Sequence, residues 1–124
     1  SDQPYVLNYL AYSWLERNIK IKQSMEMLLR AYEQKQNDPY IIDSVGWAYY
    51  LTEDYISAEK YLKSALLIMP EDPIVNDHYG DVLWRLNMKL QAIYYWNAAL
   101  SSEEADDKLK KDINKKLLFG LKNS

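Results

Sequence analysis

Residues 39–72 read PYIIDSVGWAYYLTEDYISAEKYLKSALLIMPED, and the rest of the chain follows the pattern they set. One set of residues has the i, i+3, i+4, i+7 spacing of a single helix face: Ile42, Val45, Gly46 and Tyr49. After a polar break at 52–54, a second set has helical spacing: Ala58, Leu62 and Ala65. Pro70 then ends the segment. Two short amphipathic helices cannot fully bury their apolar faces on each other, so this stretch predicts neighbours of the same kind.

The same pattern recurs at an interval of 34 residues. The interval links these pairs of positions: Gly46 and Gly80, Ala58 and Ala92, Leu62 and Trp96, Ala65 and Ala99. Similar segments open at Pro4, Pro39 and Pro73, each after a polar residue. A period of this length predicts an array of stacked helix pairs.

The phased small, aromatic and proline positions resemble those of the tetratricopeptide repeat (TPR), a helix-turn-helix of 34 residues. The middle copy carries Ile42, Val45, Gly46, Tyr49, Ala58, Leu62, Ala65 and Pro70. The third carries Tyr79, Gly80, Leu83, Ala92, Trp96 and Ala99, but departs at Asn76 and Glu104, where the family usually has an aromatic residue and a proline. The first carries Leu7, Leu10, Ala11, Trp14, Ser24, Leu28 and Ala31, with one extra residue in the turn at 18–21.

This resemblance implies an all-α, right-handed superhelix of three repeats with a C-terminal capping helix. The repeats are expected at 4–38, 39–72 and 73–106, and the cap at 107–121. Helices are expected at 4–17, 22–35, 39–51, 55–69, 73–86, 89–101 and 108–119. In the last of these, Leu109, Ile113 and Leu117 form an apolar stripe opposite many lysines. A cap is needed because stacked repeats leave an open apolar face at each end.

The composition excludes several classes of function. A net charge of −3 argues against nucleic-acid binding, because no basic stripe is present to neutralise phosphates. No run of 18 apolar residues is present to span a bilayer. The chain has no cysteine and one histidine, His78, whose neighbour Asp77 faces away from it around a helix. With three glycines there is no phosphate-binding loop, so we expect no enzyme activity, cofactor or metal.

A stripe on the first helix of each pair is not needed for folding. It takes in positions 2, 5, 9 and 12 of each copy, which in TPR proteins line a concave, peptide-binding groove. The stripe reads Tyr5, Asn8, Tyr12 and Leu15, then Tyr40, Asp43, Trp47 and Tyr50, then Ile74, Asp77, Asp81 and Trp84. Tyr and Trp offer large contact area at low cost in side-chain entropy. We take these positions, without Leu15 and Ile74, as the candidate stripe for partner binding.

A purely structural explanation stays open for the aromatic members of the stripe. Trp47, Tyr50 and Trp84 can pack between adjacent repeats, and so can Tyr5 near the end of the array. The stripe as a set is better evidence for binding than any one member.

The acidic members also have a structural explanation. Asp43 and Asp77 lie in early turns of their helices, where a carboxylate meets the positive end of the helix dipole. Asp81 follows Asp77 by one turn, and like charges at this spacing repel. An ion pair with Arg85 or a basic side chain of a ligand would relieve that repulsion, and we favour the internal pair.

The sequence therefore predicts a non-enzymatic protein-interaction module. Some TPR relatives grip a C-terminal carboxylate with Lys and Asn on this groove, but the stripe here has Asn8 and no lysine. We expect an apolar, neutral or basic peptide or a partner helix instead. One alternative is a structural spacer or self-association segment of a longer array, with Tyr5 and Tyr9 on its open N-terminal face. The other is an adaptor of an envelope enzyme such as a protease, because the chain also resembles the terminal block of long bacterial TPR proteins, many of them exported. That likeness favours the periplasm or cell envelope over the cytoplasm.

Overall fold

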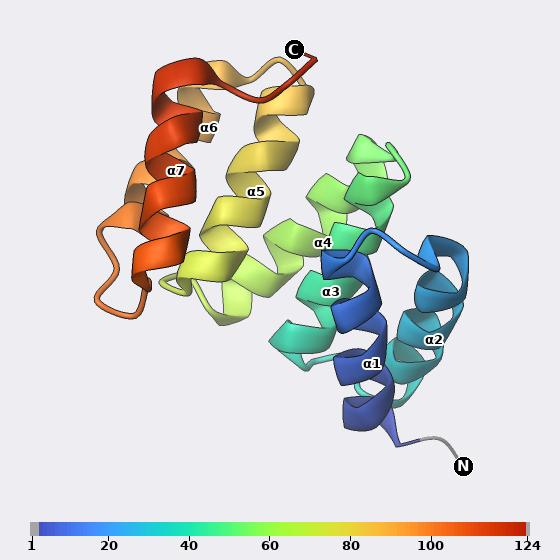
Figure 1. Cartoon of the computed structure of the whole chain (residues 1–124). Coiled ribbons are helices and arrows are strands. Elements are labelled where there is room, and N and C mark those ends of the chain that lie inside the picture. The colour runs from blue at the N-terminus through green and yellow to red at the C-terminus, as the bar shows by residue number, and fades with distance from the viewer. Residues whose placement is uncertain (1–2, 124) are drawn as a thin grey trace. The chain divides into compact units, whose positions relative to one another are not determined.

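The computed structural model describes residues 3–123, and within that part of the chain it contains seven α-helices and no strand (Figure 1). The helices are α1 (Pro4–Glu16), α2 (Ile21–Gln34), α3 (Pro39–Leu51), α4 (Tyr55–Ile68), α5 (Pro73–Arg85), α6 (Lys89–Leu100) and α7 (Asp107–Phe119). The expected all-α class and the order of helix pairs are confirmed, and each helix ends within one residue of its expected position. None of these helices combines the length and apolar character needed to cross a lipid bilayer.

Two Asp-Pro pairs start helices in the way the sequence indicates. The Asp38 carboxylate accepts hydrogen bonds from the backbone N–H groups of Tyr40 (2.9 Å) and Ile41 (3.1 Å). The Asp72 carboxylate accepts one from the N–H of Val75 at 3.0 Å. These caps satisfy donors that the first turn of a helix leaves unpaired, while the proline that follows each cap has no N–H to satisfy.

The chain divides into two compact units, the first ending at Ala65 and the second starting at Leu66. In the first unit, α1 packs against α2, and both contact α3. Its core consists of Ala11, Leu15, Leu28, Val45 and Ala48. In the second unit, α5 packs against α6, and α6 packs against α7.

The two repeat glycines lie where paired helices touch. A Cβ atom added at Gly46 of α3 would lie 2.7 Å from Cγ of Leu62 on α4. A Cβ atom at Gly80 of α5 would lie 2.5 Å from Cδ1 of Trp96 on α6. Because both contacts are shorter than a carbon pair tolerates, each glycine sets the closest approach within its pair. The phase of the 34-residue period is therefore correct.

Helix α7 closes the second unit through an apolar face. Its Ile113 is fully buried in a cluster with Trp96 and Ala99 of α6. The helix begins at the cap Asp106, whose carboxylate accepts from the N–H of Leu109 at 2.8 Å. Leu109, Leu117 and Leu121 pack around the same cluster.

Candidate functional site

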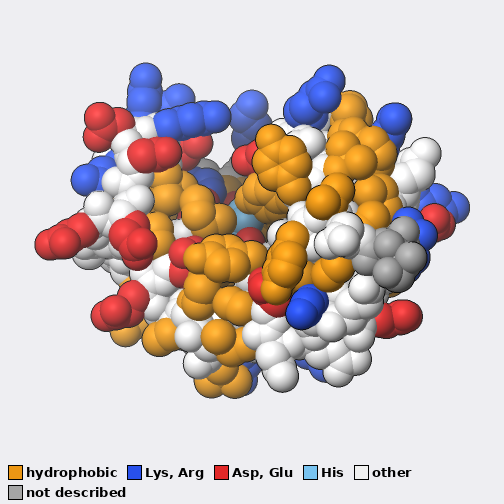
Figure 2. Space-filling model, turned by 90° about the horizontal axis from the view of Figure 1, so that it is seen from below, with side chains coloured by type: hydrophobic (Ala, Val, Ile, Leu, Met, Phe, Trp, Pro, Cys, Tyr) orange, Lys and Arg blue, Asp and Glu red, His pale blue; other side chains and the backbone are white. Residues whose placement is uncertain are grey.

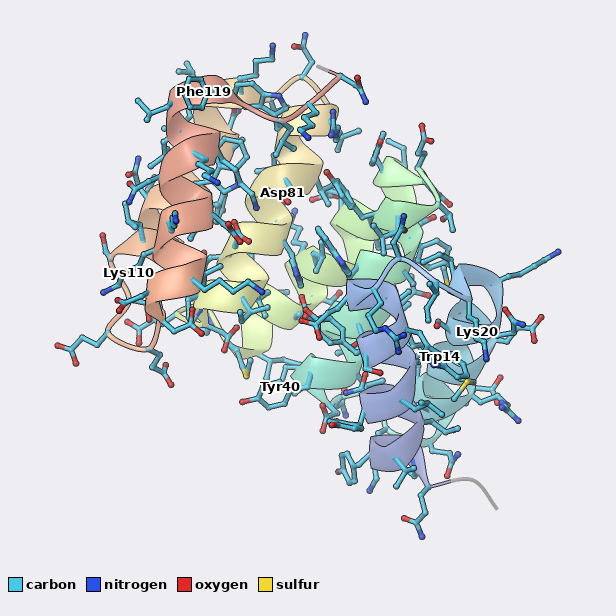
Figure 3. All side chains as sticks on the ribbon, in the orientation of Figure 1. Trp14, Lys20, Tyr40, Asp81, Lys110 and Phe119 are labelled. Atoms are coloured by element: carbon cyan, nitrogen blue, oxygen red, sulfur yellow. The ribbon has the colours of Figure 1, made fainter. Side chains whose placement is uncertain are left out.

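Seven of the ten residues of the candidate stripe lie in the first unit, on α1 and on the neighbouring α3. Tyr5 and Tyr40 are exposed, at 57% and 61%, and each lies in the first turn of its helix (Figure 3). Tyr12, Trp47 and Tyr50 are half-buried. The stripe therefore presents aromatic surface to solvent in this unit. In the view of Figure 2, hydrophobic side chains, several with visible rings, reach the surface between acidic and basic ones.

The half-buried rings of α3 are held in fixed positions by their neighbours. Trp47 and Tyr50 stack with ring centroids 4.5 Å apart and an interplanar angle of 12°. Tyr55, the first residue of α4, meets Tyr50 at 5.5 Å. Stacked rings lose little further side-chain entropy on binding, so they suit a preformed contact surface.

The polar members of the first unit are more enclosed. Asp43 is buried, with 6% of its surface exposed. Asn8 is half-buried, and its Oδ1 atom is buried without a hydrogen-bond partner among the described residues. An unsatisfied buried acceptor costs about 1–3 kcal/mol. A donor such as the backbone N–H of a bound peptide would recover part of that free energy.

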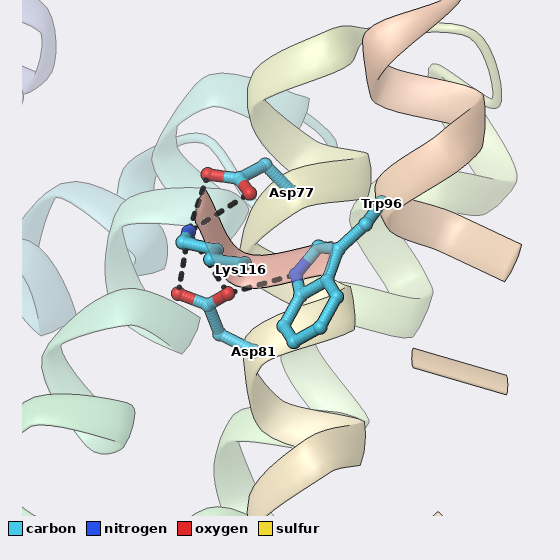
Figure 4. A network of polar contacts seen from close by, with 4 residues as sticks. All are labelled: Asp77, Asp81, Trp96 and Lys116. Atoms are coloured by element: carbon cyan, nitrogen blue, oxygen red, sulfur yellow. Dashed lines mark hydrogen bonds and ion pairs between the residues drawn. The ribbon is translucent and has the colours of Figure 1, made fainter. Parts of the chain in front are cut away.

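In the second unit, the two carboxylates of the stripe are buried beneath α7 and form a network with it (Figure 4). Lys116 Nζ lies 2.9 Å and 3.1 Å from the two carboxylate oxygens of Asp77. The same Nζ lies 3.0 Å and 3.1 Å from the two oxygens of Asp81. Trp96 Nε1 donates to Asp81 Oδ1 at 2.9 Å. One ammonium group therefore bridges two acids that lie one helical turn apart.

Burial and charge act in opposite directions on this network. Burial raises the pKa of Asp81 to about 6, although the positive charge of Lys116 works against that rise. Burial disfavours the charged form of Lys116, but the two carboxylates outweigh it and raise the pKa of Lys116 above its usual value. The lysine is thus charged at neutral pH and serves as the counter-ion of the two acids.

Trp84, the last member of the stripe, is also covered by its own unit. Its ring stacks on Trp96 with centroids 5.3 Å apart. Gly120 lies so close to it that an added Cβ would be 2.5 Å from Cζ2 of Trp84, and Lys89 Nζ lies 4.7 Å from its ring. Its Nε1 atom is buried without a hydrogen-bond partner among the described residues.

Sequence reasoning did not find Lys116. For the repulsion between Asp77 and Asp81 it favoured Arg85, whose Nη1 donates to the carbonyl of Lys122 at 2.6 Å. A signal was available in the repeat period, because two steps of 34 residues lead from Ala48 through Val82 to Lys116. A lysine at a position that is otherwise apolar and fully buried indicates a buried counter-ion.

The remaining candidates for chemistry lie apart from the stripe. Among the described residues, no group of three or more His, Cys, Asp and Glu side chains could hold a metal ion. An open pocket of about 620 Å³ lies where the α4–α5 connection meets the end of α6, and it contains no member of the stripe. Glu71, Glu103 and Glu104 line it, and its Asn76 amide already donates to the carbonyls of Pro70 and Asp72.

Comparison of the sequence identifies one relative and no matching family model. The TPR repeat-containing protein PA4667 of Pseudomonas aeruginosa is 32% identical over 80 residues. The aligned stretch spans 64% of this chain and 13% of that protein.

Solved structures share the fold over nearly the whole chain. The Yersinia enterocolitica type III secretion translocator chaperone SycD, described as an alternative dimer, has a TM-score of 0.80 and 14% identity over 95% of this chain and 91% of its own. The Sgt2 TPR domain of Aspergillus fumigatus has a TM-score of 0.73 and 10% identity over 95% and 81%. The first TPR of Spaghetti (RPAP3), bound to the HSP90 peptide SRMEEVD, has a TM-score of 0.73 and 14% identity over 93% of each chain. At these identities the structures establish the fold alone.

Proposed function

Since this chain is a tetratricopeptide-repeat protein, we propose that it is a non-enzymatic protein-interaction module, with the α1–α3 part of the candidate stripe as its contact surface. The observation that carries the proposal is the group of aromatic side chains on these two adjacent helices. Tyr5 and Tyr40 are exposed, and the stacked pair Trp47 and Tyr50 is half-buried. Exposed Tyr and half-buried Trp are residue types that dominate binding energy at protein interfaces.

The occupant we propose is an extended peptide or a helix of apolar, neutral or basic character. No lysine or arginine lies among the ten residues of the stripe, so an acidic peptide has no counter-ion there. The RPAP3 structure holds the peptide SRMEEVD, which carries three acidic residues. That peptide is therefore a suitable negative probe for this chain. The buried Asn8 Oδ1 supplies an acceptor for a backbone N–H of the bound segment.

The test uses peptides selected from a random phage-displayed library on the full chain, with affinity then measured by calorimetry. We expect the selected peptides to be apolar or basic, and SRMEEVD not to bind. Tyr40→Ala and Trp47→Ala should each weaken binding at least ~10-fold, as substitutions of interface anchors do. Tyr94→Ala is the matched control, because Tyr94 is 68% exposed on α6, outside the stripe.

Two results would contradict the proposal. One is unchanged affinity in Tyr40→Ala and Trp47→Ala while Tyr94→Ala weakens binding. The other is a selection dominated by acidic peptides. Far-ultraviolet circular dichroism of each variant checks that the helices are retained, so that a loss of binding is not read from an unfolded chain.

For the protein as a whole we propose a scaffold or adaptor at the bacterial cell envelope. The support is the resemblance to exported TPR proteins, together with the relative, of which this chain spans 13%. An adaptor for an envelope enzyme and a spacer within a longer array are both consistent with that span. Detection of the protein in the periplasmic fraction of its host would support the envelope proposal, and detection only in the cytosol would reject it.

A further inference from the structure

The outer face of α1, defined as Val6, Tyr9, Leu10 and Ser13, lies open although its repeat equivalents are buried. Val6 is 63% exposed, Tyr9 78% and Leu10 39%. One repeat later, the equivalents of Val6, Leu10 and Ser13 are Ile41, Val45 and Ala48, all at 0%. Another repeat later they are Val75, Tyr79 and Val82, at 7% or less.

The first unit shows what normally covers this face. Val45 and Ala48 of α3 pack into one cluster with Ala11 and Leu15 of α1 and Leu28 of α2. A first helix of this repeat therefore presents these positions to another helix, at van der Waals distance and without water. The outer face of α1 has the shape and chemistry to receive a helix of the same kind.

The charge distribution favours a second copy of this chain as that helix. No charged residue occurs between Pro4 and Leu15. In a two-fold dimer the same residues meet each other, so any charge on the face would be opposed by its own sign. The outer face of α1 avoids this penalty, and its Tyr9 hydroxyl can remain at the wet rim.

We propose that two copies of this chain associate through a two-fold contact in which the outer face of α1 packs on the same face of its partner. The contact residues differ from the α1 members of the candidate stripe, which are Tyr5, Asn8 and Tyr12. The inference does not depend on peptide binding by that stripe.

Sedimentation equilibrium of the chain, from about 1 to about 300 μM, tests the proposal over the range expected for modest interfaces. We expect a monomer–dimer equilibrium. Leu10→Glu should raise the dissociation constant at least ~10-fold, because it places two like charges in an apolar contact. Leu90→Glu is the matched control, since Leu90 is 83% exposed on α6, and it should leave the equilibrium unchanged.

A mixing experiment tests the symmetry. Leu10→Glu and Leu10→Lys chains should each be monomeric alone and should associate when mixed, because the two-fold contact brings opposite charges close together. A wild-type chain that remains monomeric throughout the range would overturn the proposal. So would equal effects of Leu10→Glu and Leu90→Glu, or a mixture that stays monomeric. Peptide affinity measured on Leu10→Glu is expected to match wild type, which separates this contact from the candidate stripe.

Discussion

Replacing Lys116 by methionine should destabilise the chain by about 3 kcal/mol at pH 7, the lower end of the cost of removing one partner from a buried ion pair. The side chains of Lys116, Asp77 and Asp81 are 18%, 10% and 6% exposed, so solvent screens the network little. Methionine keeps most of the length and apolar contacts of lysine while removing the charge and all three donors. The loss therefore reports on the counter-ion rather than on a cavity.

The pH dependence of this loss provides its signature. The folded-state pKa of Asp81 is raised to about 6 from an ordinary 3.8, so between these values the folded chain binds more protons than the unfolded chain. The burial penalty of Asp81 is then present above pH 6 and is relieved as the pH falls toward 4. Without Lys116 the pKa of Asp81 should rise further, because an attractive charge has been removed. The difference in stability between wild type and Lys116→Met should shrink to about 1 kcal/mol at pH 5, where the carboxyl is protonated.

Urea denaturation followed by circular dichroism, at pH 5 and pH 7, measures both quantities. Lys115→Met is the matched control, because Lys115 is the exposed neighbour on the same helix, and its effect should stay within about 0.5 kcal/mol. Asp81→Asn in the Lys116→Met background should abolish most of the extra pH dependence. A loss below 1 kcal/mol at pH 7, or a loss equal at both pH values, would refute the counter-ion argument.

Two further predictions concern the packing and the caps of the repeats. Gly80→Ala should cost about 2 kcal/mol and Gly46→Ala about 1 kcal/mol or less, because overpacking opposes the gain in helix propensity. The difference arises because the new methyl group at 80 meets the fully buried ring of Trp96, whereas at 46 it meets the flexible end of Leu62. Equal costs in urea denaturation would contradict this ranking. Asp72→Ala should cost about 1 kcal/mol through loss of the cap on α5. An unchanged midpoint would show that solvent replaces the cap.

Local signals explain why the helices and their pairing could be predicted. An Asp-Pro pair fixes the start of a helix from adjacent residues alone, and both such pairs in the chain cap helices in the structure. Gly46 and Gly80 are small because a partner helix approaches them, so their common interval carries tertiary information in a local pattern. The extra residue of the first copy lies in the turn between α1 and α2, where Asn18 and Lys20 adopt positive φ.

The surroundings of the candidate stripe could be predicted less well, because exposure depends on what packs above a residue. Tyr5 and Tyr40 lie at helix starts and are exposed in the structure. Trp84 has the same spacing, yet it is covered by Trp96 and Gly120, which follow it by 12 and 36 residues. No periodicity within α5 distinguishes these environments. Whether the ten residues bind a partner stays a prediction for the peptide experiment to decide.

The acids of the second unit illustrate how a terminal repeat changes the meaning of a pattern. Asp77 and Asp81 suggest a surface selective for basic partners when α5 is considered alone. In the structure their charge is matched by Lys116 of α7, at the position where Ala48 in α3 is apolar and fully buried. The two acids and the lysine are therefore best explained as one structural unit that allows a polar, lysine-rich helix to close the array. A charge preference for the partner must then come from the first unit, where Asp43 is the only acid of the stripe. If Asp43→Asn left the affinity for basic peptides unchanged in the calorimetric test, binding at this surface would be governed by its aromatic side chains alone.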